Sequence, residues 1–473
     1  MTEATDKGGS KPLQTLTVFT GASFIIGVVI GIGIFRTPSL VASGVGSESL
    51  FIAAWVLGGF IMLVGALCYA ELGSAHPDAG GEYHYLSRAF GRPVGVLFAW
   101  ARGTVIQTGA IAAVAFVYAE YASNILPLGT YGNAIHALVA VVAITALNLI
   151  GTPQSARAQL LLTALTILAL AAVIIAGMTT SGTVHPPIEA GSQWGTFGLA
   201  MVFVLLTYGG WNEAAYLSGE LQDVRRNMAR TLLLGTLIVT VVYVLANLAY
   251  LNVFGLEGLR TSKAVGADLM SVVAGDASAM VFSVIVCVCA LSTLNATIFT
   301  GARVYYALGR DLPAIRALGV WEMHGDKPAN ALLLQAAIAL ALVVFGSLMR
   351  DGFEAMVAYT APVFWFFMLL VALSIFIFRH GEFKGLGEYS LREILAAIPA
   401  HVLSHRVEKT NFAYKMPFYP LPPVALGAAA IWMIYSSIVY AGIGSILGVA
   451  VLLVGTPLLW LARKRGTSAE AAE

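Results

Sequence analysis

Apolar runs of about 20 residues recur along the whole chain, and they constrain the fold more than any other feature of the sequence. A run such as LLLTALTILALAAVIIAG is long enough to cross a hydrocarbon core about 30 Å thick as a helix. It lacks the alternation of a membrane β-strand. Only 11% of the 473 residues are charged, against about 25% in a typical soluble domain. We therefore predict an all-α protein that crosses a membrane many times.

The apolar runs, and the Gly, Pro and charge clusters between them, predict twelve spans. The spans are 16–43, 50–72, 94–123, 134–149, 160–177, 197–218, 231–254, 281–309, 331–348, 355–378, 424–440 and 446–461. The polar residues 1–15 form an N-terminal tail that lacks the apolar core of a cleaved signal peptide, and residues 463–473 form a C-terminal tail.

The basic residues predict the orientation, because cationic loops stay on the cytoplasmic side of a membrane. With the N-terminus inside, 20 of the 26 lysines and arginines fall in cytoplasmic segments, and three fall outside. We expect a multi-pass protein of the plasma (cell inner) membrane with both termini in the cytoplasm. The loop 380–423 then lies on the same side, and its stretch SLREILAAIPAHVLSHR reads either as a helix on the membrane surface or as an unstructured linker.

Glycines interrupt two of the predicted spans. The first span reads GVVIGIGIFRTP around Gly31 and Gly33, and the sixth reads TYGGWNEAAY around Gly209 and Gly210, with Glu213 just beyond. A single glycine in a membrane helix more often serves close helix packing. Paired breaks in corresponding positions of two halves instead indicate a transporter of inverted repeats. Because unpaired backbone groups in a bilayer cost several kcal/mol each, we expect both breaks to face a central cavity.

Helix breaks of this kind favour a zwitterionic ligand. The outgoing half-helix offers free N–H groups and a positive dipole end, and the incoming half offers free carbonyls and a negative end. We expect the ligand's carboxylate on the N–H groups and its ammonium on the carbonyls, which suits an α-amino acid better than a sugar or a bare ion. The residues concerned are Val28, Ile30, Gly31, Ile32 and Gly33 at the first break, and Leu206, Thr207, Tyr208 and Gly209 at the second.

Five motifs together resemble the amino acid, polyamine and organocation transporters, the APC superfamily. They are GIGIFRTP, YAELGSAHPDAGGEYHYLSRAFG, YGGWNEAAYLSGELQDVRRNMAR, STLNATIFTGARVYYALGRD and YKMPFYPLPP, in this order along nearly the whole chain. The resemblance implies a LeuT-type fold of five-plus-five inverted repeats with discontinuous helices 1 and 6. Residues 16–178 would form the first repeat, 195–379 the second, and 424–462 the last two helices.

The same resemblance assigns residues to the substrate. It implies that the N–H groups of Gly31, Ile32 and Gly33 hold the carboxylate, and that the carbonyls of residues 206–208 hold the amino group. The sequence departs from the family's pattern twice. Leu206 stands where many relatives have an aromatic gate, and Thr166 stands where many have a lysine that replaces a sodium ion. No lysine-based proton site is therefore expected.

Several polar or aromatic residues near the breaks allow more than one interpretation. Arg36 is either a vestibule cation that attracts carboxylates or an ion-paired arginine that stabilises the half-helix. Glu213 either contacts the ammonium group, pairs with Arg36 or caps the half-helix. Trp211 and Tyr208 act either in gating or in packing.

Charged residues at the predicted cytoplasmic helix ends indicate an inner gate or structural ion pairs rather than substrate contacts. They are Glu71, Glu220, Asp223, Arg225, Arg226 and Arg310. Arg102 and Arg303 are expected to extend to the cytoplasmic interface.

Hydroxyl groups on two spans raise the question of a coupling ion. Ser292 and Thr293, with Thr166 and free carbonyls near Gly27, could bind sodium. Alternatively the hydroxyls bond back to their own helices. Cys68, Cys287 and Cys289 lie in apolar runs and support neither a disulfide framework nor a metal site.

The sequence thus predicts amino acid transport by alternating access, of small or medium neutral substrates, as secondary active transport or exchange. A polyamine or cationic amino acid exchanger is the alternative, and a sensor of the same fold would need an output domain that is absent here. The predicted spans contain no histidine pair, aspartate pair or HExxH motif, so they do not support an enzyme. The expected partners are a free amino acid and the lipid bilayer, without nucleic acid; a partner subunit stays open. No cofactor is expected beyond sodium or a proton.

Overall fold

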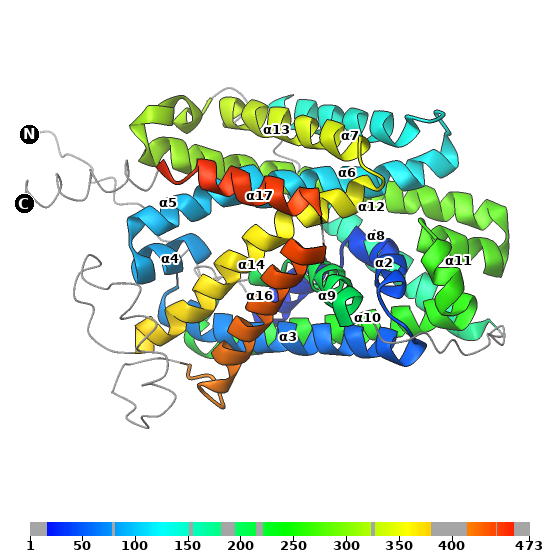
Figure 1. Cartoon of the computed structure of the whole chain (residues 1–473), viewed down its shortest axis with the longest axis horizontal. Coiled ribbons are helices and arrows are strands. Elements are labelled where there is room, and N and C mark those ends of the chain that lie inside the picture. Colours follow the sequence, from blue (N-terminus) through cyan, green and yellow to red (C-terminus); the bar gives the residue numbers. More distant parts are fainter. Residues whose placement is uncertain are drawn as a thin grey trace, which may run out of the picture.

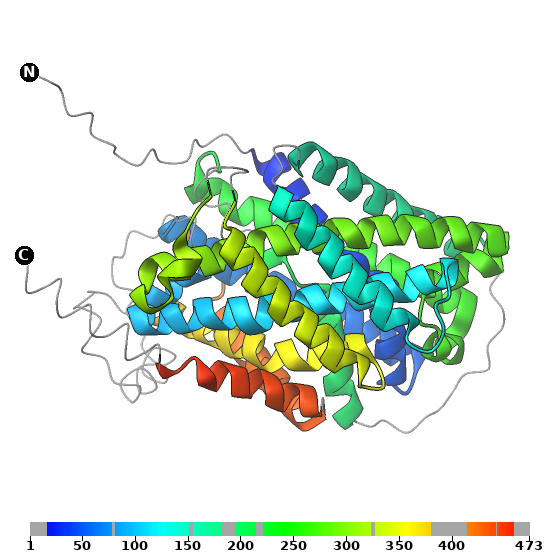
Figure 2. The ribbon, with the colours of Figure 1, turned by 90° about the horizontal axis from the view of Figure 1, so that it is seen from above.

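The computed structural model describes residues 17–77, 81–150, 155–180, 194–213, 221–322, 327–379, 414–440 and 442–457. These residues form a bundle of helices (Figures 1 and 2). Within the described ranges the only β-pairing is an isolated bridge between Glu322 and Lys327. The predicted all-α class is confirmed.

Eight helical stretches are long and apolar enough to cross a membrane. They are α3 (Glu48–Ala75), the run from α5 (Arg92–Ala101) through η2 (Arg102–Gln107) to α6 (Thr108–Ile125), α7 (Gly132–Ile150), α10 (Val224–Thr261), α12 (Asp276–Asp311), α13 (Ala329–Ser347), α14 (Gly352–Arg379) and α16 (Leu421–Tyr440). Each coincides with one predicted span.

The other four predicted spans coincide with further apolar helices. These are α1 (Val18–Val29), α8 (Ser155–Thr179), α9 (Trp194–Thr207) and α17 (Ile443–Val454). A multi-span helical protein is therefore confirmed, while the exact number of twelve spans and the inverted repeat stay predictions.

Several elements were not predicted from the sequence. The stretch between the second and third spans contains α4 (Glu82–Phe90), and α11 (Val265–Ala274) and η4 (Pro313–Gly319) flank α12. These helices are too short to give the apolar signal of a span. In Figure 1 most of the long helices run roughly parallel, with α4 near one end of the bundle and α11 near the other. We call these ends the α4 end and the α11 end.

Small residues let the central helices approach closely. α3 and α10 pack side by side (Figure 1), and a β-carbon at Gly59 of α3 would lie 2.2 Å from a methyl of Thr240 of α10. At Gly235 it would lie 3.0 Å from Ile25 of α1. Close packing of this kind stabilises helix pairs in lipid, and it holds α1 against α10 beside the first break.

Candidate functional site

The first span is broken where its glycines predict. Helix α1 ends at Val29, and after Gly31 the chain turns through the short 3-10 helix η1 (Ile32–Phe35) into α2 (Thr37–Ser43). The N–H of Gly31 donates to the carbonyl of Val29 over 2.7 Å, so this donor is engaged by the chain itself. The first N–H groups of η1 have no partner within their own helix, which leaves Ile32 and Gly33 as the predicted anion donors.

Open space lies beside Gly31. A β-carbon built there would meet nothing closer than the carbonyl oxygen of Val29, at 3.9 Å. The backbone of Gly31 is extended, with φ −101° and ψ −167°, so a larger residue is allowed by conformation. Glycine at this position therefore keeps space free rather than relieving backbone strain.

The second break lies at the end of α9. This helix ends at Thr207, and the N–H of Gly209 closes a turn on the carbonyl of Leu206 at 2.9 Å. Gly210 has φ +102°, a conformation that L-residues with a side chain rarely adopt. The chain continues through a single helical turn at 211–213, and residues 214–220 lie outside the described part.

The two breaks face each other. A β-carbon at Gly210 would lie 3.0 Å from the Val28 side chain and 3.3 Å from its carbonyl oxygen. The hydroxyls of Thr37 and Thr207 lie 2.6 Å apart, and Thr37 also donates to the carbonyl of Gly33. The predicted substrate residues are therefore brought together in space; their contact with a substrate stays a prediction.

Tyr243 of α10 joins both breaks. Its hydroxyl donates to the carbonyl of Val29 over 2.7 Å and lies 3.3 Å from the carbonyl of Thr207. The sequence pattern does not mark this residue, because one tyrosine in an apolar span carries no signal of its partners. The hydroxyl satisfies a carbonyl that the break would otherwise leave without a helical donor.

The side chains at the predicted site divide into exposed and buried ones. Val28 and Leu206 are 37% and 40% exposed. Ile30, Ile32 and Tyr208 are buried. The Tyr208 hydroxyl donates to the carbonyl of Trp55 over 3.0 Å, which supports packing rather than gating.

Trp211 also packs. Its ring lies 4.8 Å from that of Tyr69 in an edge-to-face arrangement. A β-carbon at Gly65 would approach the indole to 2.5 Å. The absence of a side chain at Gly65 therefore leaves the space that the Trp211 ring fills.

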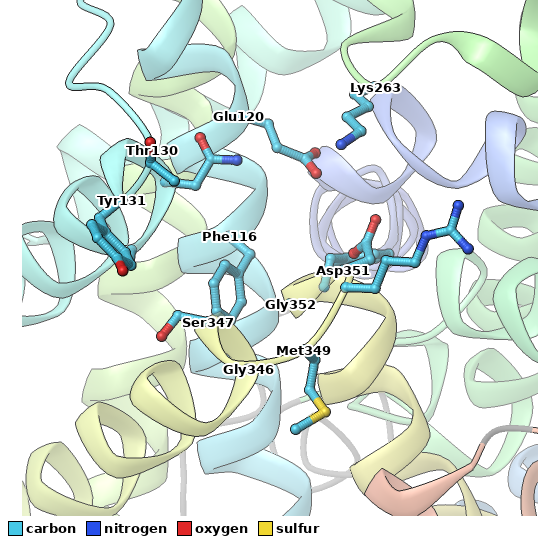
Figure 3. Close-up of a pocket in the computed structure, with 14 residues that line it drawn as sticks. Phe116, Glu120, Thr130, Tyr131, Lys263, Gly346, Ser347, Met349, Asp351 and Gly352 are labelled. Atoms are coloured by element: carbon cyan, nitrogen blue, oxygen red, sulfur yellow. The ribbon is translucent and has the colours of Figure 1, made fainter.

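Arg36 is an ion-paired arginine at the α11 end. Its side chain is 2% exposed and its Nε lies 2.9 Å from a carboxylate oxygen of Glu120 on α6. It also binds the carboxylate of Asp351, just before α14, and donates to Ser39 over 2.9 Å. Glu120 and Asp351 line the pocket shown in Figure 3. Of the two interpretations of Arg36, the ion-paired one agrees with these contacts.

Glu213 pairs with Arg102 rather than with Arg36. The Arg102 guanidinium lies 2.7 Å from Glu213 and 3.0 Å from Glu82. Asn212 and Tyr69 donate to Glu82 as well, over 2.6 and 2.9 Å. The expectation that Arg102 extends to the interface is wrong, because two acids and a position within the packed bundle hold it buried.

Glu71 forms a second ion pair at the α4 end. Both of its carboxylate oxygens accept from Arg379 at the end of α14, each over 2.5 Å. The N–H of Met416 adds a further bond of 2.8 Å. Glu71 therefore ties α3 to α14 and to the segment before α16, in agreement with a structural ion pair.

The other predicted end residues make fewer contacts. Asp223 precedes α10 in a left-handed conformation, Arg225 and Arg226 are exposed, and Arg310 lies 5.9 Å from the Tyr306 ring. Exposed Arg303 lies over the Phe299 ring at 4.0 Å. Glu220 and the stretch 390–406 lie outside the described residues.

The hydroxyls of the predicted cation site contact the protein. Thr293 donates to the carbonyl of Cys289 over 3.1 Å, within its own helix. Thr166 of α8 makes a hydrogen bond with the Cys289 thiol, and Ser292 is buried. These contacts agree with hydroxyls bonded back to the protein. In the part of the chain that is described, no three His, Cys, Asp or Glu residues cluster as for a metal, and the three cysteines are free.

A multi-span helical bundle in which two broken helices face each other defines a membrane transport protein. A family model of amino acid permeases matches residues 16–443. The chain belongs to this family, within the APC superfamily, whose members are transporters and not enzymes.

The chain is similar to several curated transporters. It is 31% identical over 372 residues to the b(0,+)-type amino acid transporter 1 of Rattus norvegicus, which covers 76% of this chain and 75% of the relative. It is 24% identical over 470 residues to the serine/threonine exchanger SteT of Bacillus subtilis (strain 168), covering 98% and 99%. It is 30% identical over 358 residues to the human large neutral amino acids transporter small subunit 2, covering 72% and 66%.

Proposed function

We propose that this permease carries small or medium neutral L-amino acids across the plasma membrane by alternating access, as an exchanger or a secondary active transporter. The observation that carries the proposal is the meeting of the two breaks, with Gly210 against Val28 and Thr207 against Thr37. The N–H groups of Ile32 and Gly33 would hold the carboxylate. The carbonyls of residues 28–30 and 206–209 would hold the ammonium group.

Two features support neutral substrates. Leu206 offers an aliphatic wall where an aromatic ring would cover a larger side chain. Among the described residues, no charged group lies within 4 Å of a β-carbon built at Gly31. Exchange and neutral substrates also agree with the names of two relatives, a serine/threonine exchanger and a large neutral amino acids transporter.

A polyamine or cationic amino acid exchanger would need acids at the site that are free to bind an amine. The nearest predicted acid, Glu213, is paired with Arg102, and Glu82 of the same network already accepts three hydrogen bonds. The pairing of these acids favours the neutral substrate class.

The distribution of basic residues supports a cytoplasmic α4 end with both termini inside the cell. One relative is named a small subunit, so assembly with a second chain is also a proposal for this protein.

Uptake into proteoliposomes tests the function. The purified chain is reconstituted, and radiolabelled alanine, serine, threonine, valine, leucine, arginine, lysine and putrescine are compared, with and without amino acid inside. We expect the neutral amino acids to be taken up fastest and internal amino acid to accelerate uptake. Uptake of only arginine, lysine or putrescine would favour the amine exchanger, and no uptake of any compound would overturn the proposal.

A further inference from the structure

The far end of α2 is held by an arginine from a distant part of the chain. Arg260, at the end of α10, donates from its Nε to the carbonyl of Ala42 over 2.9 Å. From its Nη2 it donates to the carbonyl of Val45 over 2.7 Å. Its Nη1 pairs with Glu257, whose side chain is mostly exposed. One guanidinium therefore holds two backbone carbonyls where α2 ends.

Both carbonyls need a donor from outside the helix. The last carbonyls of a helix have no partner within it, and Ala42 and Val45 are buried. At the end of α2, the N–H of Gly44 closes one turn on the carbonyl of Val41 over 3.0 Å. A cation at this end also complements the helix dipole. Arg260 thus supplies both the donors and the charge that the end of α2 requires.

The helix α2 depends on such tertiary contacts. It has seven residues and no side-chain cap at its N-terminus, whereas isolated helices shorter than about 12–15 residues are marginal in water. It packs against α9 and α10 (Figure 1), and a β-carbon at Gly44 would lie 2.9 Å from that of Ala200 on α9. Contacts with neighbouring helices therefore decide where α2 lies.

The near end of α2 is joined to the anion donors of the proposed site. The short helix η1, which contains Ile32 and Gly33, is separated from α2 by Arg36 alone. The ion pairs of Arg36 and the hydroxyl contact of Thr37 hold this near end. A short helix held at one end can still tilt about that end, and the attached N–H donors tilt with it. Because Arg260 holds the other end, α2 is fixed at both ends.

We propose that Arg260 is a positioning residue for substrate binding. By holding the far end of α2, it keeps the N–H groups of Ile32 and Gly33 directed into the space between the two breaks, where the substrate's carboxylate binds. Arg260 itself does not touch the substrate, because its guanidinium is bonded at the opposite end of α2. This inference rests on the proposed function, since it assumes that these N–H groups bind a carboxylate.

Substitutions of Arg260 in the reconstituted full chain test this role. Arg260→Gln removes the cation, and Arg260→Lys keeps a cation but loses the planar fork that reaches two carbonyls. The probe is the neutral amino acid with the fastest uptake. We expect KM to rise about tenfold in Arg260→Gln and less in Arg260→Lys, with little change in the maximal rate per folded molecule. Hydrogen exchange should become faster over residues 31–45 and stay unchanged over α9.

Two controls separate positioning from general stability. Glu257→Gln removes the exposed partner of Arg260 and leaves both carbonyl bonds in place. Lys327→Gln removes the donor to the Leu149 carbonyl at the end of α7, a helix that contributes no residue to either break. We expect Lys327→Gln to lower the thermal midpoint, as Arg260→Gln does, and both controls to keep the KM of the wild type.

A wild-type KM in Arg260→Gln, or an equal rise of KM in Lys327→Gln, would overturn the role of Arg260 and leave the proposed function intact. If Arg260→Gln does not fold, Arg260→Lys decides. A wild-type KM together with wild-type exchange over residues 31–45 in that variant would then overturn the role. A wild-type chain that transports no amino acid would overturn the proposed function itself.

Discussion

The hydroxyl of Tyr243 donates to the carbonyl oxygen of Val29 over 2.7 Å, and thereby fixes the last turn of α1 to α10. The same hydroxyl lies 3.3 Å from the Thr207 carbonyl at the end of α9. One phenol therefore sets the spacing of both breaks. Any ligand ammonium that uses these carbonyls must share them with Tyr243.

Tyr243→Phe should weaken substrate binding. The change removes one of the two hydrogen bonds that the Val29 carbonyl accepts, since the Gly31 N–H also donates to it. This loss costs about 0.5–1.5 kcal/mol, and it frees the two breaks to move apart. Tyr305→Phe is the control, because Tyr305 donates to the Gly103 carbonyl over the same 2.7 Å. We expect both variants to lower the thermal midpoint, and only Tyr243→Phe to lower affinity in a binding assay. Equal affinities in the two variants would contradict the role of Tyr243.

Gly31→Leu should abolish substrate binding at the central site while leaving folded protein. The extended backbone accepts leucine, and its first side-chain atom enters open space, so the added atoms fill the site. Gly427→Ala on α16 is the control, since its β-carbon would make only an ordinary 3.6 Å contact with Leu369. Binding and size-exclusion profiles are compared. Central-site binding close to that of the wild type in Gly31→Leu would rule out this location for the site.

Glu82→Gln should destabilise the fold much more than Glu213→Gln. Glu82 is 4% exposed and accepts from three side chains, and breaking a buried ion pair on one side costs about 3–5 kcal/mol. Glu213 is 35% exposed at its side chain. Its loss leaves Arg102 still paired with Glu82, so we expect a smaller cost. Thermal unfolding in detergent measures the difference. A larger loss for Glu213→Gln would mean that Glu82 is not the centre of the network.

Transport should be independent of sodium. Thr293 and Thr166 both make hydrogen bonds with Cys289, which favours hydroxyls held by the protein. We expect equal substrate affinity in sodium and choline buffers, and little change in Thr293→Ala. If affinity instead rises with sodium and Thr293→Ala removes the rise, the residues near Gly27 and Ser292 form a sodium site.

Stability should decrease as the pH falls from about 6.5 toward 4, in part through His76. Burial, and then the nearby charges of Arg88 and His84, lower the pKa of His76 to about 4. The unfolded chain therefore binds a proton in this window that the folded chain does not, and stability is lost as the pH falls. His76→Phe keeps an aromatic ring against Phe378, 4.4 Å away in the wild type. Its thermal midpoint should decrease less over the same window, and an identical decrease would contradict the role of His76.

The amino-acid sequence alone determined the multi-span helical class, the two breaks and the likeness to transporters. The length of an apolar run decides whether a helix can cross the bilayer, and a glycine at mid-span weakens the helix at that point. Both effects depend on the local sequence, so they can be predicted without knowing which residues lie nearby in space. The positions of the breaks at Gly31 and Gly210 followed from the sequence for this reason.

The tertiary structure decided which charged and polar groups meet. Arg36 binds Glu120 and Asp351, which lie 84 and 315 residues further along the chain. Arg102 forms ion pairs with both Glu82 and Glu213. Tyr243 reaches back to Val29 across 214 residues. No local pattern marks such pairs, because a long side chain on one helix can meet any acid or carbonyl within a few ångströms. The packing of the helices alone fixes which one it meets.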